Sequence, residues 1–478
     1  MTPPRPAAPP GDSPGAQRVA DADPDPNSTT NTRAASRFVE PARLRRILVL
    51  ALPIIAAMVS QSLLNVIDTA MVGQLGDAAL AAVGLGSFVL FTCQAMILGL
   101  SVGVQAIAAR RKGEGRLDET AVPLNASLLL ILIIGPVLTL ALYWLAPWFF
   151  PLLTPDPAVV AGAVPYFQIR MLAGPLMAMN YAFRGYWNGI GQSRLYMITL
   201  LIMHASNVLL NYMFIYGHFG APELGVPGAA LATALSVLIG TTLYYGFGWR
   251  YALQGGFLRR RPNRQDVTTL VRISVPAGLQ HVSQSAGLVA LYWIIGRIGT
   301  AELAAANVLV NLMTVAILPG MGLAIAAATL VGQSLGQGDV ADARRWTRDT
   351  LRVGMLGLAL LGAPMVLAPD LILGLFLHSP DTIALARWPM RIAGLAVMLE
   401  GIKRIYMQVL MSAGDGRRVM RISVLTQWGM FTPLAYMIGP VWGLGLLGIW
   451  LGQEVYRLTQ VAVFRRYWRQ GHWARIRI

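Results

Sequence analysis

Charged residues are scarce in this chain of 478 residues: Asp, Glu, Lys and Arg make up 13% of it, whereas 55% of the residues are hydrophobic. A soluble protein of this length would carry roughly a quarter charged residues. No stretch beyond residue 45 has the polar composition of a solvent-exposed domain. The scarcity of charge therefore excludes an ordinary soluble enzyme and indicates a polytopic membrane protein.

Cysteine and the common catalytic motifs are nearly or fully absent. The single cysteine, Cys93, lies in an apolar run and allows neither an intrachain disulfide nor a thiolate metal site. The chain has no GxxxxGK[ST] phosphate loop, no HExxH and no run of Cys and His at metal-ligand spacing. We therefore expect no cofactor, no resident metal and no ATP-driven step, and no nucleophile and base pair points to an enzyme.

Long apolar segments are abundant instead. A helix that spans a bilayer needs about 20 largely apolar residues. Twelve segments meet this requirement: 44–72, 78–108, 121–150, 159–187, 195–216, 225–249, 267–296, 302–333, 351–376, 383–412, 419–438 and 441–464. They predict an all-α polytopic membrane protein with twelve transmembrane helices.

Basic residues orient these spans. They gather in alternate connections, at 110–116, 194, 259–264, 344–348 and 417–418. Positively charged loops stay on the cytoplasmic side, so we expect both termini in the cytoplasm. The net charge of +16 then reflects topology and contact with anionic lipid, and we expect no nucleic-acid partner.

The chain contains an internal repeat. Residues 53–115 align with residues 276–338 without a gap, and Val59-Ser60-Gln61-Ser62 falls on Val282-Ser283-Gln284-Ser285. Since six spans separate the two copies, both halves enter the membrane in the same sense. The repeat predicts two six-helix lobes with a site between them, as in transporters built from repeats.

These patterns predict five regions along the chain. Residues 1–36 are rich in Pro, Ala, Asp and Ser and lack the apolar core of a signal peptide, which favours disorder. The regions are a disordered cytoplasmic tail (1–42), an N-terminal six-helix lobe (43–250), a basic cytoplasmic linker (251–266), a C-terminal six-helix lobe (267–465) and a basic cytoplasmic tail (466–478).

A polar stripe marks the first span. Gln61, Asn65 and Asp68 are spaced i, i+4 and i+7, which places them on one helix face. Polar groups in hydrocarbon are costly and usually face a cavity or a partner. The stripe therefore predicts a site that holds H+ or Na+ on Asp68. In the alternative interpretation, Asp68 only caps the end of its span in water.

A second stripe marks the fifth span. His204, Asn207 and Asn211 are spaced i, i+3 and i+7, so they also share one helix face. Together the two stripes predict a small pocket rich in amide groups around Asp68.

The second half carries different polar residues. Position 291, which is equivalent to Asp68, is Leu, while the seventh span offers Gln280, His281 and Gln284. The two halves are therefore not equivalent, and these three residues are candidates for a substrate site or a second ion site.

The tenth span carries an acid with two cations one turn later. Glu400 is followed by Lys403 and Arg404 at i+3 and i+4. The three residues are candidates for the same substrate or second ion site. Alternatively, they form a self-neutralised structural ion pair. Glu454 and Arg457 on the last span, also at i+3, favour a plain internal pair.

Three segments resemble one known family. They are LALPIIAAMVSQSLLNVIDTAMVGQLG from Leu50, ASNVLLNYMFIYG from Ala205 and GLAIAAATLVGQSLGQGD from Gly322, with SAGDGRR after the tenth span. The chain resembles the multidrug and toxic compound extrusion (MATE) transporters, of the bacterial NorM and DinF type, over about residues 43–465. The resemblance implies two six-helix lobes and cation-coupled efflux through a central cleft.

The resemblance also implies roles for single residues. Asp68 matches a first-span acid assigned to H+ or Na+ coupling, and Asn207 matches a fifth-span Asn of that site. Asn211 stands where some members have Asp, and Gln284 stands where NorM-like members have Glu. Glu400 matches their tenth-span acid, so the coupling site could lie in either lobe.

The leading prediction, implied by the resemblance, is a secondary antiporter of the cytoplasmic (inner) membrane of a bacterium. It would work as a monomer in the lipid bilayer, without a partner chain. It would export organic, cationic and drug-like small molecules in exchange for H+ or Na+. The alternative is a flippase or exporter of a lipid-linked or anionic precursor on a similar two-lobe scaffold. Arg170, Lys403 and Arg404 would favour this alternative if they lined the cleft. A receptor or assembly factor without transport is the third hypothesis.

Overall fold

The computed structural model describes residues 39–377, 379–476 and 478, and no strand occurs within these ranges. Of the predicted disordered tail, 1–42, positions 1–38 lie outside the described residues. The first-half elements are α1 (Pro41–Gly73), α2 (Asp77–Gly113), η1 (Leu117–Glu119), α3 (Val122–Leu153), α4 (Pro157–Leu172), α5 (Gly174–Gly189), α6 (Ser193–Tyr216), η2 (His218–Gly220), α7 (Val226–Phe247) and η3 (Gly248–Ala252). The second-half elements are α8 (Arg264–Gly296), α9 (Thr300–Gly336), α10 (Val340–Leu367), α11 (Pro369–Leu373), α12 (Pro380–Ser412), α13 (Gly416–Thr426), η4 (Gln427–Phe431), α14 (Thr432–Tyr436), η5 (Met437–Val441), α15 (Gly445–Gln470) and η6 (His472–Arg475).

Helices cover all twelve predicted spans. Eight helical segments among the described residues are long and apolar enough to cross a membrane: α1, α2, η1 with α3, α6, α7 with η3, α9, α10 and α12. The predicted span 159–187 is broken between α4 and α5, and the predicted span 419–438 is divided among α13, η4, α14 and η5. The all-helical polytopic fold is confirmed, although several spans are interrupted rather than continuous.

Side-chain caps decide where some helices begin. Asn263 and Asp266 form a capping box at the start of α8, in which each side chain accepts a hydrogen bond from the other residue's backbone N–H. Asp339 caps α10 by accepting from the backbone N–H of Asp342. For this reason α10 begins at Val340 and not at the predicted start of the span, 351, and its first turns carry the basic residues of the connection.

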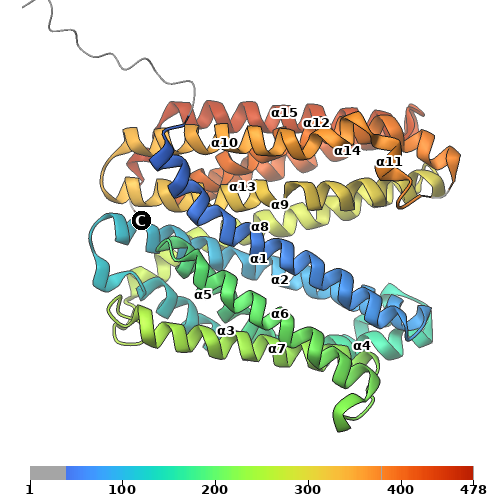
Figure 1. Cartoon of the computed structure of the whole chain (residues 1–478), viewed down its shortest axis with the longest axis horizontal. Coiled ribbons are helices and arrows are strands. Elements are labelled where there is room, and N and C mark those ends of the chain that lie inside the picture. Colours follow the sequence, from blue (N-terminus) through green and yellow to red (C-terminus); the bar gives the residue numbers. More distant parts are fainter. Residues whose placement is uncertain (1–38, 378, 477) are drawn as a thin grey trace, which may run out of the picture. The chain divides into compact units, whose positions relative to one another are not determined.

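The internal repeat extends to helix boundaries. Helices α1 and α8 both have 33 residues, and α2 and α9 both have 37. Figure 1 shows α10, α12 and α15 together in one bundle and α3, α6 and α7 in another. Residues from Pro41 to Ile478 form one compact unit, so the lobes pack on each other. The predicted domain boundaries remain a prediction.

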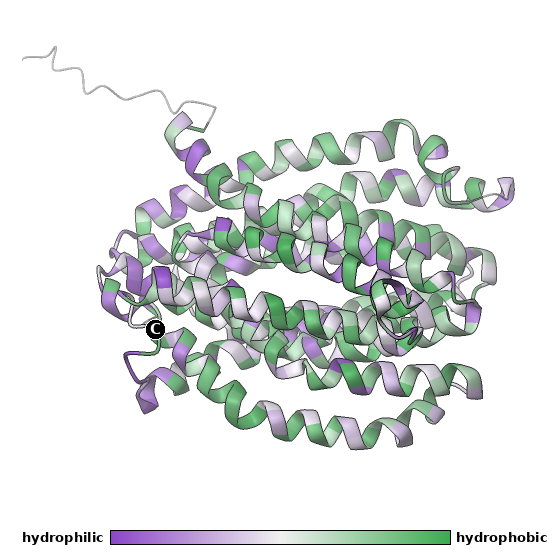
Figure 2. Cartoon of the chain, turned by 60° about the horizontal axis from the view of Figure 1, so that its bottom comes forward, coloured by the Kyte–Doolittle hydropathy of each residue, from purple (hydrophilic) through white to green (hydrophobic). Residues whose placement is uncertain are grey.

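The two lobes approach closely near the end that carries the basic connections. A Cβ added to Gly99 of α2 would lie 2.2 Å from the backbone oxygen of Ser274 in α8, and one added to Gly113 would lie 2.0 Å from that of Gln333 in α9. Figure 2 shows hydrophilic residues gathered at the same end as the C-terminal residues. Small residues therefore let the helices of the two lobes touch there.

We expect Gly99→Ala to destabilise the protein, because its Cβ would overlap the α8 backbone, which cannot give way as a flexible side chain would. Overpacking of this kind costs about 1–3 kcal/mol, and thermal unfolding in detergent measures the effect as a lower melting temperature. Gly84→Ala on the same helix is the matched control, since a Cβ there meets nothing within 4 Å. Equal melting temperatures for the two variants would contradict the close approach of α2 and α8.

Candidate functional site

The polar stripes of the first and fifth spans lie on α1 and α6, which pack against each other. Gln61 Nε2 donates to Asn65 Oδ1 over 3.1 Å. The two ring nitrogens of His204 lie 3.1 Å from Gln61 Oε1 and 2.8 Å from Ser60 Oγ. The structure therefore brings one end of each predicted stripe into a single hydrogen-bonded group.

Asp68 joins the other end of these stripes. Asn211 Nδ2 donates to Asp68 Oδ1 over 2.7 Å and to Asn207 Oδ1 over 3.0 Å. Asn207 Nδ2 donates to Thr233 Oγ1 over 3.2 Å and to Ser236 Oγ over 3.4 Å, both on α7. We call these five residues the N-lobe cluster. Both asparagines are almost fully buried, at 1% exposure, so helices α1, α6 and α7 enclose the cluster.

The N-lobe cluster contains a buried acceptor oxygen that is free to bind a cation. Asn211 Oδ1 is buried and has no hydrogen-bond partner among the described residues. No basic side chain of the described chain forms an ion pair with Asp68. Hard cations prefer carboxylate and amide oxygens, and a carboxylate withdrawn from water favours its protonated form or a cation partner. The arrangement can therefore hold a proton or a Na+ ion.

The alternative role of Asp68 as a helix cap does not fit this geometry. Helix α1 continues beyond Asp68 to Gly73. The carboxylate is half-buried and bound by Asn211. A negative charge near a helix C-terminus also opposes the helix dipole, so the cap would be unfavourable.

Two members of the N-lobe cluster were not predicted from the sequence. Thr233 and Ser236 support Asn207 from α7. They lie one helical turn apart in the mainly apolar first half of α7, and this spacing is the signal that could have revealed them.

A basic residue from a fourth helix acts on the same acid. Arg170 on α4, which the sequence linked only to an anionic substrate, donates to Tyr166 OH over 2.9 Å. It also acts electrostatically on Asp68. Arg170 thus contributes a positive potential at the acid, and the described residues show no ion pair between the two.

The tenth-span acid has different surroundings. Glu400 forms ion pairs with Lys403 Nζ at 2.6 Å, with Arg404 Nε at 3.0 Å and with Arg457 Nε at 3.5 Å. Arg457 also pairs with Glu454. We call these five residues the C-lobe cluster. Their side chains are 6–16% exposed, so the cluster is buried between α12 and α15.

The C-lobe cluster leaves no acid free. Three cations against two acids give a net charge of one positive, and both oxygens of Glu400 face cations. The sequence predicted a plain internal pair for Glu454 and Arg457. The structure corrects this expectation, because Arg457 also reaches Glu400 across the helix interface. Such a network ties α12 to α15 and does not resemble a cation site.

Within the described part of the chain, the candidates on α8 form no hydrogen bond with the C-lobe cluster. Gln280 is buried, at 4% exposure, and its Oε1 has no hydrogen-bond partner among the described residues. Gln284 is half-buried. Arg404 acts on His281 electrostatically. The predicted second site is therefore not assembled as one hydrogen-bonded group. Within the described ranges, no group of three or more His, Cys, Asp and Glu residues could hold a metal ion.

Comparison with known families gives two matches along the chain. The family model described as MatE matches residues 53–213 and residues 276–437. The two matched stretches begin at Pro53 and Pro276, which are also the first residues of the two copies of the internal repeat.

Individual relatives match over most of their length. A probable multidrug resistance protein NorM of Rhizobium meliloti is 29% identical over 426 residues, covering 86% of this chain and 90% of that protein. The multidrug resistance protein PmpM of Pseudomonas aeruginosa is 27% identical, covering 88% of this chain and 90% of that protein.

Solved structures share the fold. One is described as the outward-facing conformation of a multidrug resistance MATE family transporter of the MOP superfamily; it superposes with a TM-score of 0.81 at 22% identity and covers 90% of this chain and 95% of that chain. A MOP superfamily transporter from Pyrococcus furiosus, whose binding pocket is described as having reverse polarity, gives the same TM-score, identity and coverage.

Proposed function

The chain belongs to the MatE family of membrane transporters, and from this premise we propose that it exports organic, cationic and drug-like compounds across the bacterial cytoplasmic membrane in exchange for H+ or Na+. It is a transporter and not an enzyme. Its relatives in Rhizobium meliloti and Pseudomonas aeruginosa are named as multidrug resistance proteins, and this supports the drug-like class.

The N-lobe cluster is the observation that carries this proposal. A membrane-embedded acid is functional by default, and Asp68 has an amide donor but no ion-pair partner among the described residues. The unpaired Asn211 Oδ1 beside it supplies a further oxygen ligand. Gln61 and Asn65 extend the polar surface along α1. We therefore assign the coupling ion to Asp68.

The closed end of the lobes suggests how coupling would work. The lobes touch at the end with the basic connections, which we assign to the cytoplasm. Under this assignment the lobes are closed toward the cytoplasm. A cation that binds Asp68 more tightly in one conformation than in the other shifts the equilibrium toward that conformation. The substrate would bind the other conformation more tightly and shift the equilibrium back.

An exporter of an anionic or lipid-linked precursor is the second candidate. The net positive C-lobe cluster favours it, and a transporter of the same fold from Pyrococcus furiosus has a pocket described as having reverse polarity. However, Lys403 and Arg404 are already engaged by Glu400. They are therefore poorly placed to recruit an anion, and the cationic substrate class is favoured.

Transport by the purified protein in liposomes tests the proposal. A fluorescent organic cation is loaded on the side of the cytoplasmic face, and a proton gradient or a Na+ gradient is imposed separately. We expect export driven by one of the two gradients and lost when that gradient is dissipated with an ionophore. Transport of an anionic lipid analogue, with no movement of the cation under either gradient, would contradict the cationic substrate class.

A further inference from the structure

One ion-paired contact joins the start of α1 to the second lobe. Arg43 Nη1 lies 2.7 Å from Asp342 Oδ1, and Arg43 Nε lies 2.5 Å from Asp349 Oδ2, both on α10. The guanidinium also stacks over Trp346, 3.6 Å from the ring centroid. These side chains are 12–25% exposed, so the contact is largely withdrawn from water. We call Arg43, Asp342 and Asp349 latch 1.

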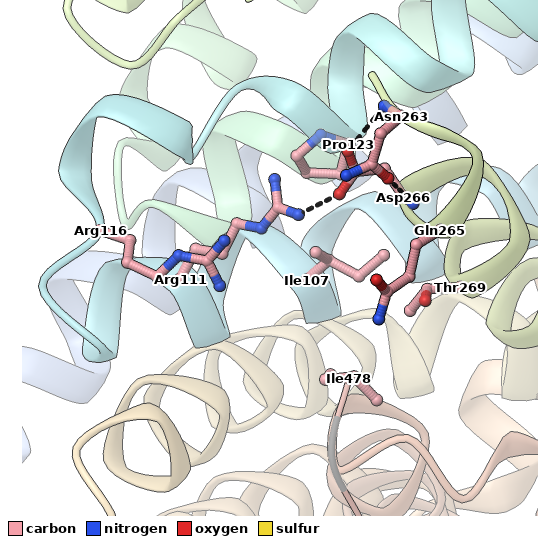
Figure 3. A pocket seen from close by; sticks show the side chains of 9 residues that line it. All are labelled: Ile107, Arg111, Arg116, Pro123, Asn263, Gln265, Asp266, Thr269 and Ile478. Atoms are coloured by element: carbon pink, nitrogen blue, oxygen red, sulfur yellow. Dashed lines mark hydrogen bonds and ion pairs between the residues drawn. The ribbon is translucent and has the colours of Figure 1, made fainter. Parts of the chain in front are cut away.

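A second contact joins the end of α2 to the start of α8. Arg111 Nη2 lies 2.5 Å from Asp266 Oδ1, and the two side chains are 10% and 14% exposed. Figure 3 shows the Arg111 guanidinium directed at the Asp266 carboxylate, beside a pocket of about 150 Å³ that residues of both lobes line. Asp266 is held in turn by Asn263. We call Arg111 and Asp266 latch 2.

The first-helix residues of the two latches occupy equivalent places in the repeat. Arg43 is the third residue of α1, and Asp266, its equivalent in the second copy, is the third residue of α8. In latch 1 the start of α1 reaches α10, which follows the second long helix of the C-terminal lobe, whereas in latch 2 the start of α8 reaches the last turn of α2 itself.

The partner residues lie at the same connection in each copy, between α2 and α3 or between α9 and α10, but at positions that are not equivalent. Asp342 of latch 1 is equivalent to Glu119, and Arg111 of latch 2 is equivalent to Ser334. At the connection between α9 and α10, Ser334 Oγ donates to Asp342 Oδ2 over 2.7 Å. At the connection between α2 and α3, Arg111 Nη1 donates to the backbone oxygen of Glu119 over 3.0 Å. In both copies, therefore, a hydrogen bond joins the end of the second long helix to the segment that follows it.

The polarity of the latches is inverted between the repeats. The first-helix residue is a cation in latch 1 and an acid in latch 2. As a result, both cations come from the N-terminal lobe, at Arg43 and Arg111, and all three acids come from the C-terminal lobe. At these two contacts, therefore, the N-terminal lobe is positive and the C-terminal lobe is negative, so both contacts draw the lobes together.

We propose that latches 1 and 2 form a charge-complementary gate, which holds the lobes together at the basic end and must open for the transport cycle to expose its site on that side. The gating role in transport rests on the proposed function, whereas the closure of the lobes does not. Opening separates partly buried opposite charges, which is unfavourable until water replaces each partner.

Thiol labelling tests the gate. Ser274→Cys in a Cys93→Ser background provides the reporter, because Ser274 is 5% exposed and packs against Gly99 and Gly103 of the other lobe. Thr268→Cys, exposed on the same helix, gives the maximal labelling rate. The full-length protein in liposomes is treated with a thiol reagent that reaches both faces, and labelling after denaturation gives the total thiol.

We expect the charge reversals Arg43→Asp and Asp266→Arg to raise the labelling rate of the reporter by about tenfold each. Arg45→Asp is the matched control, because Arg45 is exposed and makes no ion pair within the described chain. Its labelling rate should stay at the background value. The neutral variant Arg43→Gln should give an intermediate rate and is the milder alternative if a reversal prevents folding.

Charge exchange decides between gating and misfolding. Arg43→Asp combined with Asp342→Arg and Asp349→Arg, and Asp266→Arg combined with Arg111→Asp, should restore slow labelling to within about twofold of background. The second exchange matters because Asp266 also caps α8, and the exchange restores the ion pair but not the cap. The proposed gate would be overturned if the single reversals gave the same labelling rate of the reporter as Arg45→Asp. It would also be overturned if the charge exchanges did not restore slow labelling. A protein that transports nothing but shows the expected labelling would refute the proposed function alone.

Discussion

Gradient-driven export should fall on the order of 100-fold in the Asp68→Asn variant, which is the size of effect expected when one coupling interaction is removed. Asparagine has the shape of protonated Asp, and its Oδ1 can still accept the 2.7 Å hydrogen bond from Asn211. It cannot release a proton or neutralise Na+. The variant therefore resembles a transporter fixed in the neutral state of its coupling site. The measurement is the initial rate of export from liposomes under the gradient that drives the wild type.

Two comparisons keep this result interpretable. Asp77→Asn is the matched control, since Asp77 is an exposed acid at the start of α2 and the variant should export at the wild-type rate. The melting temperature of Asp68→Asn should not fall, because its hydrogen bond persists and a buried charge is removed. Export by Asp68→Asn at more than about half the wild-type rate would rule out Asp68 as the coupling group, and the search would move to the C-terminal lobe.

Glu400→Gln should have its largest effect on stability. The change leaves Lys403, Arg404 and Arg457 buried together with only Glu454 to oppose them. Breaking a buried ion pair by removing one partner costs about 3–5 kcal/mol, because the remaining charges are uncompensated. In a chain of this size, with an unfolding entropy of about 2 cal/mol/K per residue, the melting temperature in detergent should fall by roughly 3–5 °C. Thermal unfolding followed by tryptophan fluorescence measures the effect.

The double variant Glu400→Gln with Lys403→Met removes one acid and one cation together. It keeps the net charge of the C-lobe cluster, so we expect it to recover at least about half of the lost stability. Any double variant that folds should still export under the same gradient as the wild type. A Glu400→Gln variant of unchanged stability that no longer responds to the gradient would contradict the structural role and place ion coupling in the C-terminal lobe.

Several features followed from the sequence because they depend on one helix at a time. The spacing of Gln61, Asn65 and Asp68 predicted a common helix face, and Gln61 does donate to Asn65 in the structure. The apolar segments predicted the helices, and the ungapped repeat anticipated the equal lengths of α1 and α8 and of α2 and α9. Helical periodicity and hydrophobicity are local properties, so they can be read without knowledge of the neighbours.

Contacts between helices were harder to predict. The sequence favoured a plain pair between Glu454 and Arg457, and only the packing of α12 on α15 brought Arg457 to Glu400. Thr233 and Ser236 were missed because a hydroxyl in an apolar helix often bonds to its own backbone. Whether it also supports a neighbour, as Thr233 supports Asn207, depends on which face the neighbour presents.

By itself, the sequence determined the membrane class, the helices, the two-lobe repeat and the stripe that contains Asp68, since all of these depend on the composition and period of single segments. Only the tertiary structure decided which charges are free and which are paired. Glu400 and Asp68 are both acids within predicted spans, yet three cations surround one and an amide binds the other. Arg43 and Asp342 are 299 residues apart, and no local pattern links them. The physical reason is that ion pairing depends on distance in space, and the packing of the helices sets that distance.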